Sequence, residues 1–245
     1  LRKRKKRAVK KPPKQKPEED LFGPVREGYE PAEKDLIDVG CRYVAGFDEA
    51  GRGALAGPIS IGLVIFSPDF FLQDLPEDLQ EIGDSKILSE KKRETLYPII
   101  KKHALFAASI HVSSRELDRI GINPATEKAL LFALERSVRA GTRPGMVLVD
   151  GRYSLLEIKQ KGFECRCVID GDAKIFSIAA ASILAKVTRD RRMIRFARYF
   201  PGYDLEIHKG YGTLSHRKAM EEKGMTPIHR RSYHLHDHQV DTDSQ

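Results

Sequence analysis

Short apolar segments along the chain predict the strands of a single sheet. "RYVAGF" and "PISIGLVIF" flank a glycine-rich loop, and so short a connection between two strands predicts an antiparallel hairpin. Residues Phe106–Val112 predict a third strand, and "FECRCVID" predicts another. "MVLVD" is continuously apolar up to its aspartate, which predicts a strand buried on both faces.

Segments with apolar residues at three- and four-residue intervals predict the helices. Ser89 is expected to start a helix through "EKKRETLYPIIKKH", and Pro98 is expected to end or kink it. A second helix is expected with Asn123 as its cap, Pro124 at its first position and Gly141 at its end.

The C-terminal third of the sequence predicts two more helices. "IFSIAAASILAKVTRDRRMIRFARYF" begins with small and apolar residues, becomes basic, and ends before Pro201. "LSHRKAMEEKG" is a shorter helix that Gly224 terminates. Together with the strands, this order predicts an α/β fold in which helices flank a mixed sheet, followed by a small helical C-terminal part.

Composition and charge are those expected of a soluble intracellular protein. Of the 245 residues, 40% are apolar and 32% are charged. No apolar run approaches the roughly 18 residues of a membrane span. Proline and charge follow the basic N-terminus in place of an apolar segment, so a secretory signal is not expected. Three cysteines without a C-x-x-C pair predict neither a disulfide framework nor a structural zinc site. We therefore expect a cytoplasmic protein with no membrane association.

The net charge of +8 has its origin in the N-terminus. Residues 1–16 contain 10 lysine and arginine residues and no acid, which leaves 33 basic and 35 acidic side chains elsewhere. We expect residues 1–35 to be a disordered basic arm and linker, residues 36–235 to form the folded domain, and residues 236–245 to be a polar tail. The arm is interpreted either as a solvated charge run or as a segment that binds polyanions or serves as a nuclear address.

Acidic residues stand at the ends of the predicted buried strands. Asp48 and Glu49 close the first strand, Asp150 closes "MVLVD", and Asp172 follows "FECRCVID". If these strands are neighbours, the four carboxylates converge and repel one another unless a cation lies between them. Oxygen ligands of this kind favour Mg²⁺ or Mn²⁺ over zinc, and two such ions assist phosphodiester hydrolysis. Each acid taken alone is also consistent with a turn or capping residue.

The loop after the first acidic pair contains Gly51, Arg52 and Gly53. Glycine lets a backbone approach a sugar–phosphate chain, and arginine can hold a phosphate with its planar group of donors. The glycine spacing also suggests a dinucleotide-binding fingerprint, but Pro58 and a β-branched run follow where that motif requires a helix. A plain hairpin loop is the remaining alternative.

Several blocks of sequence, over roughly residues 40–233, together resemble the ribonuclease HII family. The blocks are "GFDEAGRGALAGPIS", "DSK", "VLVDG", "GDAK", "IAAASILAKVTRDR", "KGYGT" and "MTPIHRRSY". The resemblance implies a ribonuclease H-like fold with a central mixed five-stranded sheet. It also implies an endoribonuclease that cleaves the RNA strand of RNA–DNA hybrids and nicks 5′ of single ribonucleotides embedded in DNA. The products would carry 5′-phosphate and 3′-hydroxyl ends.

The same resemblance implies roles for individual residues. The catalytic quartet, which would bind Mn²⁺ or Mg²⁺, consists of Asp48, Glu49, Asp150 and Asp172. Recognition of the 2′-hydroxyl and phosphate at the RNA–DNA junction is implied for Gly51, Arg52 and Gly53, and stacking on the following deoxyribose for Tyr211. Contacts with phosphates are implied for Lys86, Lys174, Ser182 and Lys186. Asp190 is expected to support the site.

Two questions stay open at this level. Asp170 stands where the family often has a lysine, so either Asp170 or Asp172 can be the fourth acid, although the spacing favours Asp172. A DNA-specific nuclease or recombinase of the same fold and a non-catalytic nucleic-acid-binding protein are the rival functions. Tyr211 and the glycine loop argue against the DNA-specific enzyme, because DNA has no 2′-hydroxyl to recognise. We expect a monomer.

Overall fold

The centre of the fold is a mixed five-stranded sheet. The computed structural model describes residues 33–82 and 88–233, and the strand order is β3-β2-β1-β4-β5. β1 pairs antiparallel with β2, and β2 with β3, whereas the β1–β4 and β4–β5 pairs are parallel. In chain order the strands span Val44–Ala50, Ile59–Ile65, Phe106–Val112, Met146–Asp150 and Cys165–Val168.

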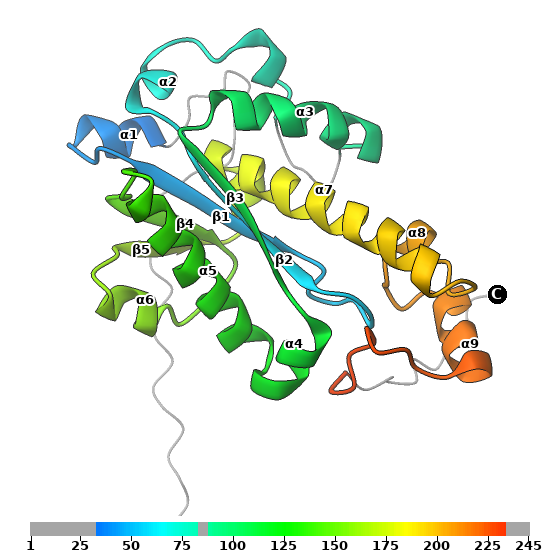
Figure 1. Cartoon of the computed structure of the whole chain (residues 1–245). Helices are drawn as coiled ribbons and strands as arrows, with labels where there is room; N and C mark the ends of the chain where they lie inside the picture. Colours follow the sequence, from blue (N-terminus) through cyan, green and yellow to red (C-terminus); the bar gives the residue numbers. More distant parts are fainter. Residues whose placement is uncertain (1–32, 83–87, 234–245) are drawn as a thin grey trace, which may run out of the picture.

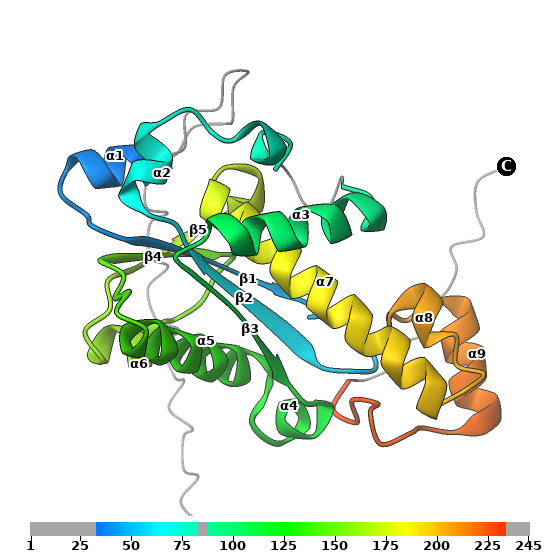
Figure 2. The same ribbon diagram turned by 45° about the horizontal axis from the view of Figure 1, so that its top comes forward.

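Helices cover both faces of this sheet (Figure 1). The described α-helices, α1 to α9, span Glu33–Asp38, Pro68–Leu72, Glu90–His103, Ser114–Ile120, Ile122–Arg139, Leu156–Gln160, Phe176–Tyr199, Leu205–His208 and Leu214–Lys223. Two 3₁₀ turns, η1 and η2, span Glu77–Leu79 and Gly171–Ala173. Helices α5 and α6 lie on one face, and α7 and α3 lie on the other (Figure 2). Helices α8 and α9 lie beside the C-terminal end of α7 and form the helical C-terminal part.

Alternation of side chains along the strands produces two separate core layers. Phe47 of β1 packs into the layer under α5, whereas Val44 packs into the layer that contains Ile178 of α7. Two strand glycines allow α7 to come very close. A Cβ atom added at Gly62 would lie 2.0 Å from the carbonyl oxygen of Ala181, and one added at Gly46 would lie 2.1 Å from the Ser177 carbonyl carbon. The backbone of α7 therefore packs directly against β1 and β2.

Most of the predicted elements are confirmed. The strands at Phe106–Val112 and Met146–Asp150 match their predicted bounds, and the first two strands form the predicted antiparallel hairpin. The long helix α7 ends before Pro201, and α9 ends before Gly224, as predicted. The prediction of the fold class is also confirmed, since the sheet is mixed and lies between helices.

One predicted helix is confirmed in full and the start of another is wrong. α3 spans Glu90–His103 with Ser89 as its cap, as predicted, and it continues past Pro98 because Leu96 and Ile100 on either side of the proline are anchored in the core. Asn123 does not cap α5, because that helix already begins at Ile122. The preceding residue, Gly121 at φ +84°, ends α4 and starts α5, which leaves the asparagine side chain for another contact.

Helix α1 spans residue 36, the predicted start of the folded domain. Helix α1 begins at Glu33, whose side chain is fully buried and accepts a 2.6 Å hydrogen bond from the backbone N–H of Ser177. The basic arm 1–16, Lys86 and the tail 236–245 lie outside the described residues. Within the described ranges, no helix has the length and apolar character needed to cross a membrane.

Candidate active site

Asp48 and Asp150 lie beside each other at the carboxyl ends of two parallel strands. The last registered pair between β1 and β4 is Phe47 with Val149, and each aspartate follows one residue later. Both aspartates therefore fall on the face of the sheet that α7 covers. Crevices outside the carboxyl ends of parallel strands are the usual ligand sites of α/β sheets. The structure thus brings together two of the acids that the sequence singled out.

Glu49 is directed toward the opposite face of the sheet. It follows Asp48 in the same strand, and successive side chains of a strand alternate between faces. A carboxylate oxygen of Glu49 lies 3.5 Å from the Arg52 guanidinium. Tyr153, whose ring packs edge-on against Phe47 at 6.2 Å, lies on this face as well. The two adjacent carboxylates therefore approach the edge of the sheet from different sides.

Asp172, the fourth predicted acid, lies in the 3₁₀ turn that follows β5. The backbone N–H of Gly171 donates a 2.7 Å hydrogen bond to Oδ1 of Asp150, which fixes this turn against the end of β4. Asp172 in the turn is only 1% exposed, whereas Asp170 at its start is exposed and has a left-handed φ of +53°. Burial beside Asp150 therefore favours Asp172, and not Asp170, as the fourth member of the group.

Asp48 and Glu49 lie in an unfavourable electrostatic environment. Burial, and then the negative charges of Glu49 and Asp150, raise the pKa of Asp48 well above its usual range, while a hydrogen bond from Ser182 acts in the opposite direction. Burial raises the pKa of Glu49 as well, although Tyr153 and Arg52 partly compensate. A bound cation would relieve this repulsion and favour the ionised forms.

The donor set fits a hard divalent cation. Oε2 of Glu49 is buried and has no hydrogen-bond partner, and oxygen is the ligand that Mg²⁺ and Mn²⁺ prefer. Among the described residues, no three acidic, histidine or cysteine side chains already form a closed group that could hold a metal ion. The structure thus provides neighbouring carboxylates and an unsatisfied acceptor, but not an assembled coordination sphere.

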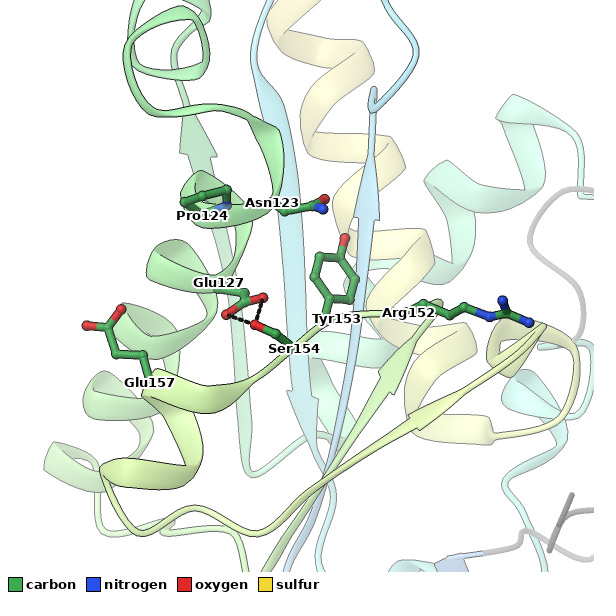
Figure 3. A pocket seen from close by; sticks show the side chains of 7 residues that line it. All are labelled: Asn123, Pro124, Glu127, Arg152, Tyr153, Ser154 and Glu157. Atoms are coloured by element: carbon green, nitrogen blue, oxygen red, sulfur yellow. Dashed lines mark hydrogen bonds between the residues drawn. The ribbon is translucent and has the colours of Figure 1, made fainter. Parts of the chain in front are cut away.

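Arg52 is held at the side of this acidic group by several contacts. Its Nη1 atom donates a 3.0 Å hydrogen bond to the Tyr153 hydroxyl, and its Nη2 atom donates to Oδ1 of Asn123. Asn123, which does not cap its helix, therefore serves to orient an arginine. Asn123 and Tyr153 line a hollow of about 250 Å³. Their side chains are drawn with the other lining residues in Figure 3. Sequence patterns gave no sign of either residue's role, because their contact with Arg52 depends on the fold.

The glycine loop has one filled side and one open side. Gly51 has a φ of +88°, and a Cβ atom there would lie 1.9 Å from Nε of Arg189. Glycine is therefore required at residue 51 by backbone conformation and by the neighbouring arginine. In contrast, a Cβ atom at Gly53 would meet no atom within 4 Å. The space beside Gly53 is open to a ligand.

Two buried arginines that the sequence analysis did not single out hold this loop. Arg189 of α7, 1% exposed, donates to the carbonyl oxygens of Pro58 at 3.0 Å and Ala56 at 3.2 Å. Burial lowers the pKa of Arg189 to about 10. Arg230, in the segment after α9, donates to three carbonyls of the same loop. Their presence in "TRDR" and "HRRSY" was the available signal, but charged residues in such blocks more often face solvent.

Tyr211 lies next to the same loop and is 43% exposed. The guanidinium of Arg189 lies over its ring, and the N–H groups of Leu55 and Ala56 donate to the carbonyl of the neighbouring Gly210. The structure therefore places the predicted stacking residue beside the glycine loop, with part of its ring accessible to solvent.

Three buried histidines, His208, His216 and His229, lie against the segment around Tyr211. Nδ1 of His208 accepts a hydrogen bond from the Gly210 N–H, and Nδ1 of His216 lies 2.9 Å from the Tyr211 carbonyl. The Nε2 atoms of His216 and His229 lie 3.1 Å apart. All of these contacts are satisfied if each ring is neutral, since each then has one donor and one acceptor nitrogen.

The other residues with predicted roles lie on several elements of the fold or outside the described ranges. Ser182 of α7 is buried and contacts Asp48, and Lys186 is half-buried one helical turn further along the same helix. Lys174 ends the turn that contains Asp172. The carboxylate of Asp190 lies 3.7 Å from the Arg93 guanidinium of α3. Lys86 falls outside the described ranges.

The chain is similar to proteins of one known family, both in sequence and in structure. The family described as Ribonuclease HII matches residues 45–236. Ribonuclease HII of Ligilactobacillus salivarius is 46% identical over 202 residues, which cover 82% of this chain and 73% of that protein. The ribonuclease H2 structure from Pyrococcus horikoshii has a TM-score of 0.62 and 27% identity, and the alignment covers 78% of this chain and 93% of that one. The ribonuclease HII in a complex with PCNA from Archaeoglobus fulgidus has a TM-score of 0.64 and 25% identity, covering 81% and 98%.

A mixed sheet with buried acids at its carboxyl edge and an adjacent glycine loop, together with the likeness to these solved structures, defines a nuclease of the ribonuclease H fold. More narrowly, the chain belongs to the ribonuclease HII family. It is therefore a phosphodiester hydrolase that acts on the RNA strand of RNA–DNA hybrids, and enzymes of this kind depend on divalent metal ions.

Proposed function

We propose that this enzyme nicks DNA 5′ of single embedded ribonucleotides, as well as cutting longer RNA–DNA hybrids, and that it leaves 5′-phosphate and 3′-hydroxyl ends. The observation that carries the proposal is that Asp48 and Asp150 meet at the carboxyl edge of the sheet, where the glycine loop with the open space at Gly53 directly follows β1. A phosphate held by metal ions on these carboxylates would have its flanking sugar near the glycine loop.

The acids bind and orient the reacting groups in this proposal. Asp48, Glu49, Asp150 and Asp172 would hold one or two Mn²⁺ or Mg²⁺ ions, with Oε2 of Glu49 as an acceptor that lacks any other partner. Bound at this edge, such ions would supply activation of water and neutralisation of charge on the phosphate. Ser182 orients Asp48 by a hydrogen bond from the buried face of α7.

Selection of the ribonucleotide falls to the glycine loop and to Tyr211. Gly51, Arg52 and Gly53 would contact the 2′-hydroxyl and the adjacent phosphate, because a 2′-hydroxyl is the group that separates RNA from DNA at one nucleotide. Tyr211 would stack on the next sugar with the accessible part of its ring. The contacts of Arg52 with Asn123 and Tyr153 hold its guanidinium near the acids before a substrate arrives.

Basic residues around the site would bind the flanking phosphates. Lys174 and Lys186 adjoin elements that carry Asp172 and Ser182, and Lys86 is proposed from its motif alone. Such contacts position a nucleic acid without reading its sequence. Asp190, which is paired with Arg93, would support this surface indirectly by fixing α3 against α7. We further propose that the enzyme is a cytoplasmic monomer whose partner is nucleic acid.

The test is a labelled DNA duplex with one ribonucleotide, incubated with Mg²⁺ or with Mn²⁺. The wild type should produce a single nick 5′ of the ribonucleotide with a 3′-hydroxyl end that a polymerase extends. Asp48→Asn should reduce the nicking rate by at least about 10³-fold, because a ligand is lost while the shape is kept. Asp204→Asn, at an exposed position that caps α8, is the matched control. Unimpaired nicking by Asp48→Asn would contradict the proposal.

A further inference from the structure

Arg230 is a fully buried cation whose hydrogen bonds go to the glycine loop. Its Nη2, Nη1 and Nε atoms donate to the carbonyl oxygens of Gly51 at 2.7 Å, Arg52 at 2.9 Å and Gly57 at 3.1 Å. Burial lowers the pKa of this guanidinium. Burying a charge is unfavourable, and a neutral side chain would fill the same volume at lower cost. Packing alone therefore does not explain why an arginine is buried at residue 230.

The direction of these carbonyls determines where the neighbouring N–H groups point. The C=O and N–H of one trans peptide unit point in opposite directions, and none of the described peptide bonds is cis. The carbonyl of Gly51 points at Arg230, so the N–H of Arg52 points away from it. The carbonyl of Arg52 also points at Arg230, so the N–H of Gly53 points away as well.

Gly53, whose N–H belongs to the second of these peptide units, borders open space. No atom lies within 4 Å of the position that a Gly53 Cβ atom would occupy. The cation behind the two carbonyls also polarises the peptide units, which strengthens their N–H groups as donors. Two adjacent, polarised donors thus point away from Arg230 and lie next to the open space at Gly53.

The segment that carries Arg230 is itself fixed to the loop and to α4. The backbone N–H of Arg230 donates to the Leu55 carbonyl at 2.8 Å. The carboxylate of Asp118 accepts hydrogen bonds from the N–H groups of Arg231 and Ser232, both at 2.9 Å. The hydroxyl of Tyr233 gives the Arg52 carbonyl a second donor at 2.9 Å. Arg230 is therefore held in one place, so it can hold the loop in one conformation.

We infer that Arg230 is a positioning residue for ribonucleotide selection: it aims the N–H groups of Arg52 and Gly53 at the 2′-hydroxyl and the adjacent phosphate. Tyr233 assists it at one of the carbonyls. The inference rests on the proposed function, because it takes the glycine loop to be the part of the enzyme that recognises the 2′-hydroxyl. It extends that proposal to a residue that never touches the substrate.

The experiment compares two DNA duplexes that differ in a single 2′-hydroxyl. One duplex contains a ribonucleotide and is cut, which yields kcat and KM, and the all-deoxy duplex acts as a competitor, which yields an inhibition constant. Arg230→Lys keeps the charge but loses the planar fork of donors. Arg143→Gln, which removes a guanidinium donor to the Gly162 carbonyl elsewhere in the fold, is the matched control.

Arg230→Lys should lower kcat/KM for the ribonucleotide duplex by about tenfold or more, the loss of roughly one good hydrogen bond. The inhibition constant of the all-deoxy duplex should change by less than about twofold. Tyr233→Phe, which removes one hydroxyl at a half-buried position, should move the same ratio in the same direction by a smaller factor. If Arg230→Lys fails to fold, the ratio measured for Tyr233→Phe tests the inference in its place.

Three outcomes overturn proposals in different ways. If both substitutions leave the ratio of the two constants unchanged, Arg230 is merely structural and the inference is overturned, whatever happens to the overall rate. If Arg143→Gln shifts the ratio equally, the effect is not specific to the glycine loop and the inference is again overturned. If the wild type does not nick at the ribonucleotide at all, the proposed function fails and the inference fails with it.

Discussion

The guanidinium carbon of Arg189 lies 5.2 Å from the centre of the Tyr211 ring. The same buried group donates to the carbonyls of Pro58 and Ala56 at the end of the glycine loop. One side chain of α7 therefore links the two parts of the chain that are proposed to recognise the substrate, and it does so from the helix that also carries Ser182 beside Asp48.

Arg189→Met should weaken substrate binding more than it slows the chemical step. The substitution removes two charge-assisted hydrogen bonds and a cation–π contact, so we expect KM for a ribonucleotide duplex to rise by about tenfold with a smaller change in kcat. Steady-state nicking kinetics measure both constants. Arg189→Lys, which keeps the charge, should have an intermediate KM. A wild-type KM in Arg189→Met would exclude the proposed link.

Asp172→Asn and Asp170→Asn should have very different effects. Asp172 is buried beside the end of β4, whereas Asp170 is exposed and adopts a left-handed conformation that asparagine also tolerates. We expect Asp172→Asn to lose at least about 10²-fold in kcat, and Asp170→Asn to stay within about threefold of wild type. Nicking assays on both variants measure these losses. A larger loss of kcat in Asp170→Asn than in Asp172→Asn would identify Asp170 as the fourth acid.

Gly62→Ala should destabilise the fold through the contact with α7. The new methyl group would lie 2.0 Å from the backbone oxygen of Ala181, so strand and helix must separate, at a cost of about 1–3 kcal/mol in the free energy of unfolding. Gly53→Ala is the matched control for stability, because its Cβ atom would meet open space. Urea unfolding of both variants provides the comparison, and equal stabilities would rule out the close helix–sheet packing.

The histidines beside Tyr211 predict that stability falls in mild acid. Burial lowers the pKa of His229 to about 4, and it also lowers the pKa of His216. A histidine in the unfolded chain titrates near about 6.5. Between these two pH values the unfolded chain binds protons that the folded chain does not, so the free energy of unfolding is highest above pH ~6.5 and declines as the pH falls toward 4.

His111, whose pKa is also lowered to about 4 by burial and by two arginines, contributes to the same decline. The contribution of the histidines beside Tyr211 is therefore isolated by His229→Gln, which keeps a donor toward His216 but cannot be protonated. Urea unfolding between pH 7.5 and 4.5 should show a shallower decline for this variant than for the wild type. Parallel curves would show that His229 titrates normally in the folded state.

The positions of several strands and helix ends were predictable from local sequence. Alternation and continuous apolar runs are properties of neighbouring residues, and so the strands at Phe106–Val112 and Met146–Asp150 and the end of α7 before Pro201 were found from the sequence. Position at a strand end is also local, which is why Asp48 and Asp150 stood out as candidates. Motif spacing was sufficient to indicate the family.

Contacts between distant residues were decided only by the tertiary structure. The alternation of β1 sends Asp48 toward α7 and Glu49 toward Tyr153, but only the pairing of β1 with β4 puts Asp150 beside Asp48. Arg230 meets the carbonyl of Gly51 across 179 positions of sequence. A local pattern specifies which residues share an element and a face. Which charges, carbonyls and rings then meet depends on how the elements pack, because the free energy of those contacts exists only once the sheet and its helices are assembled.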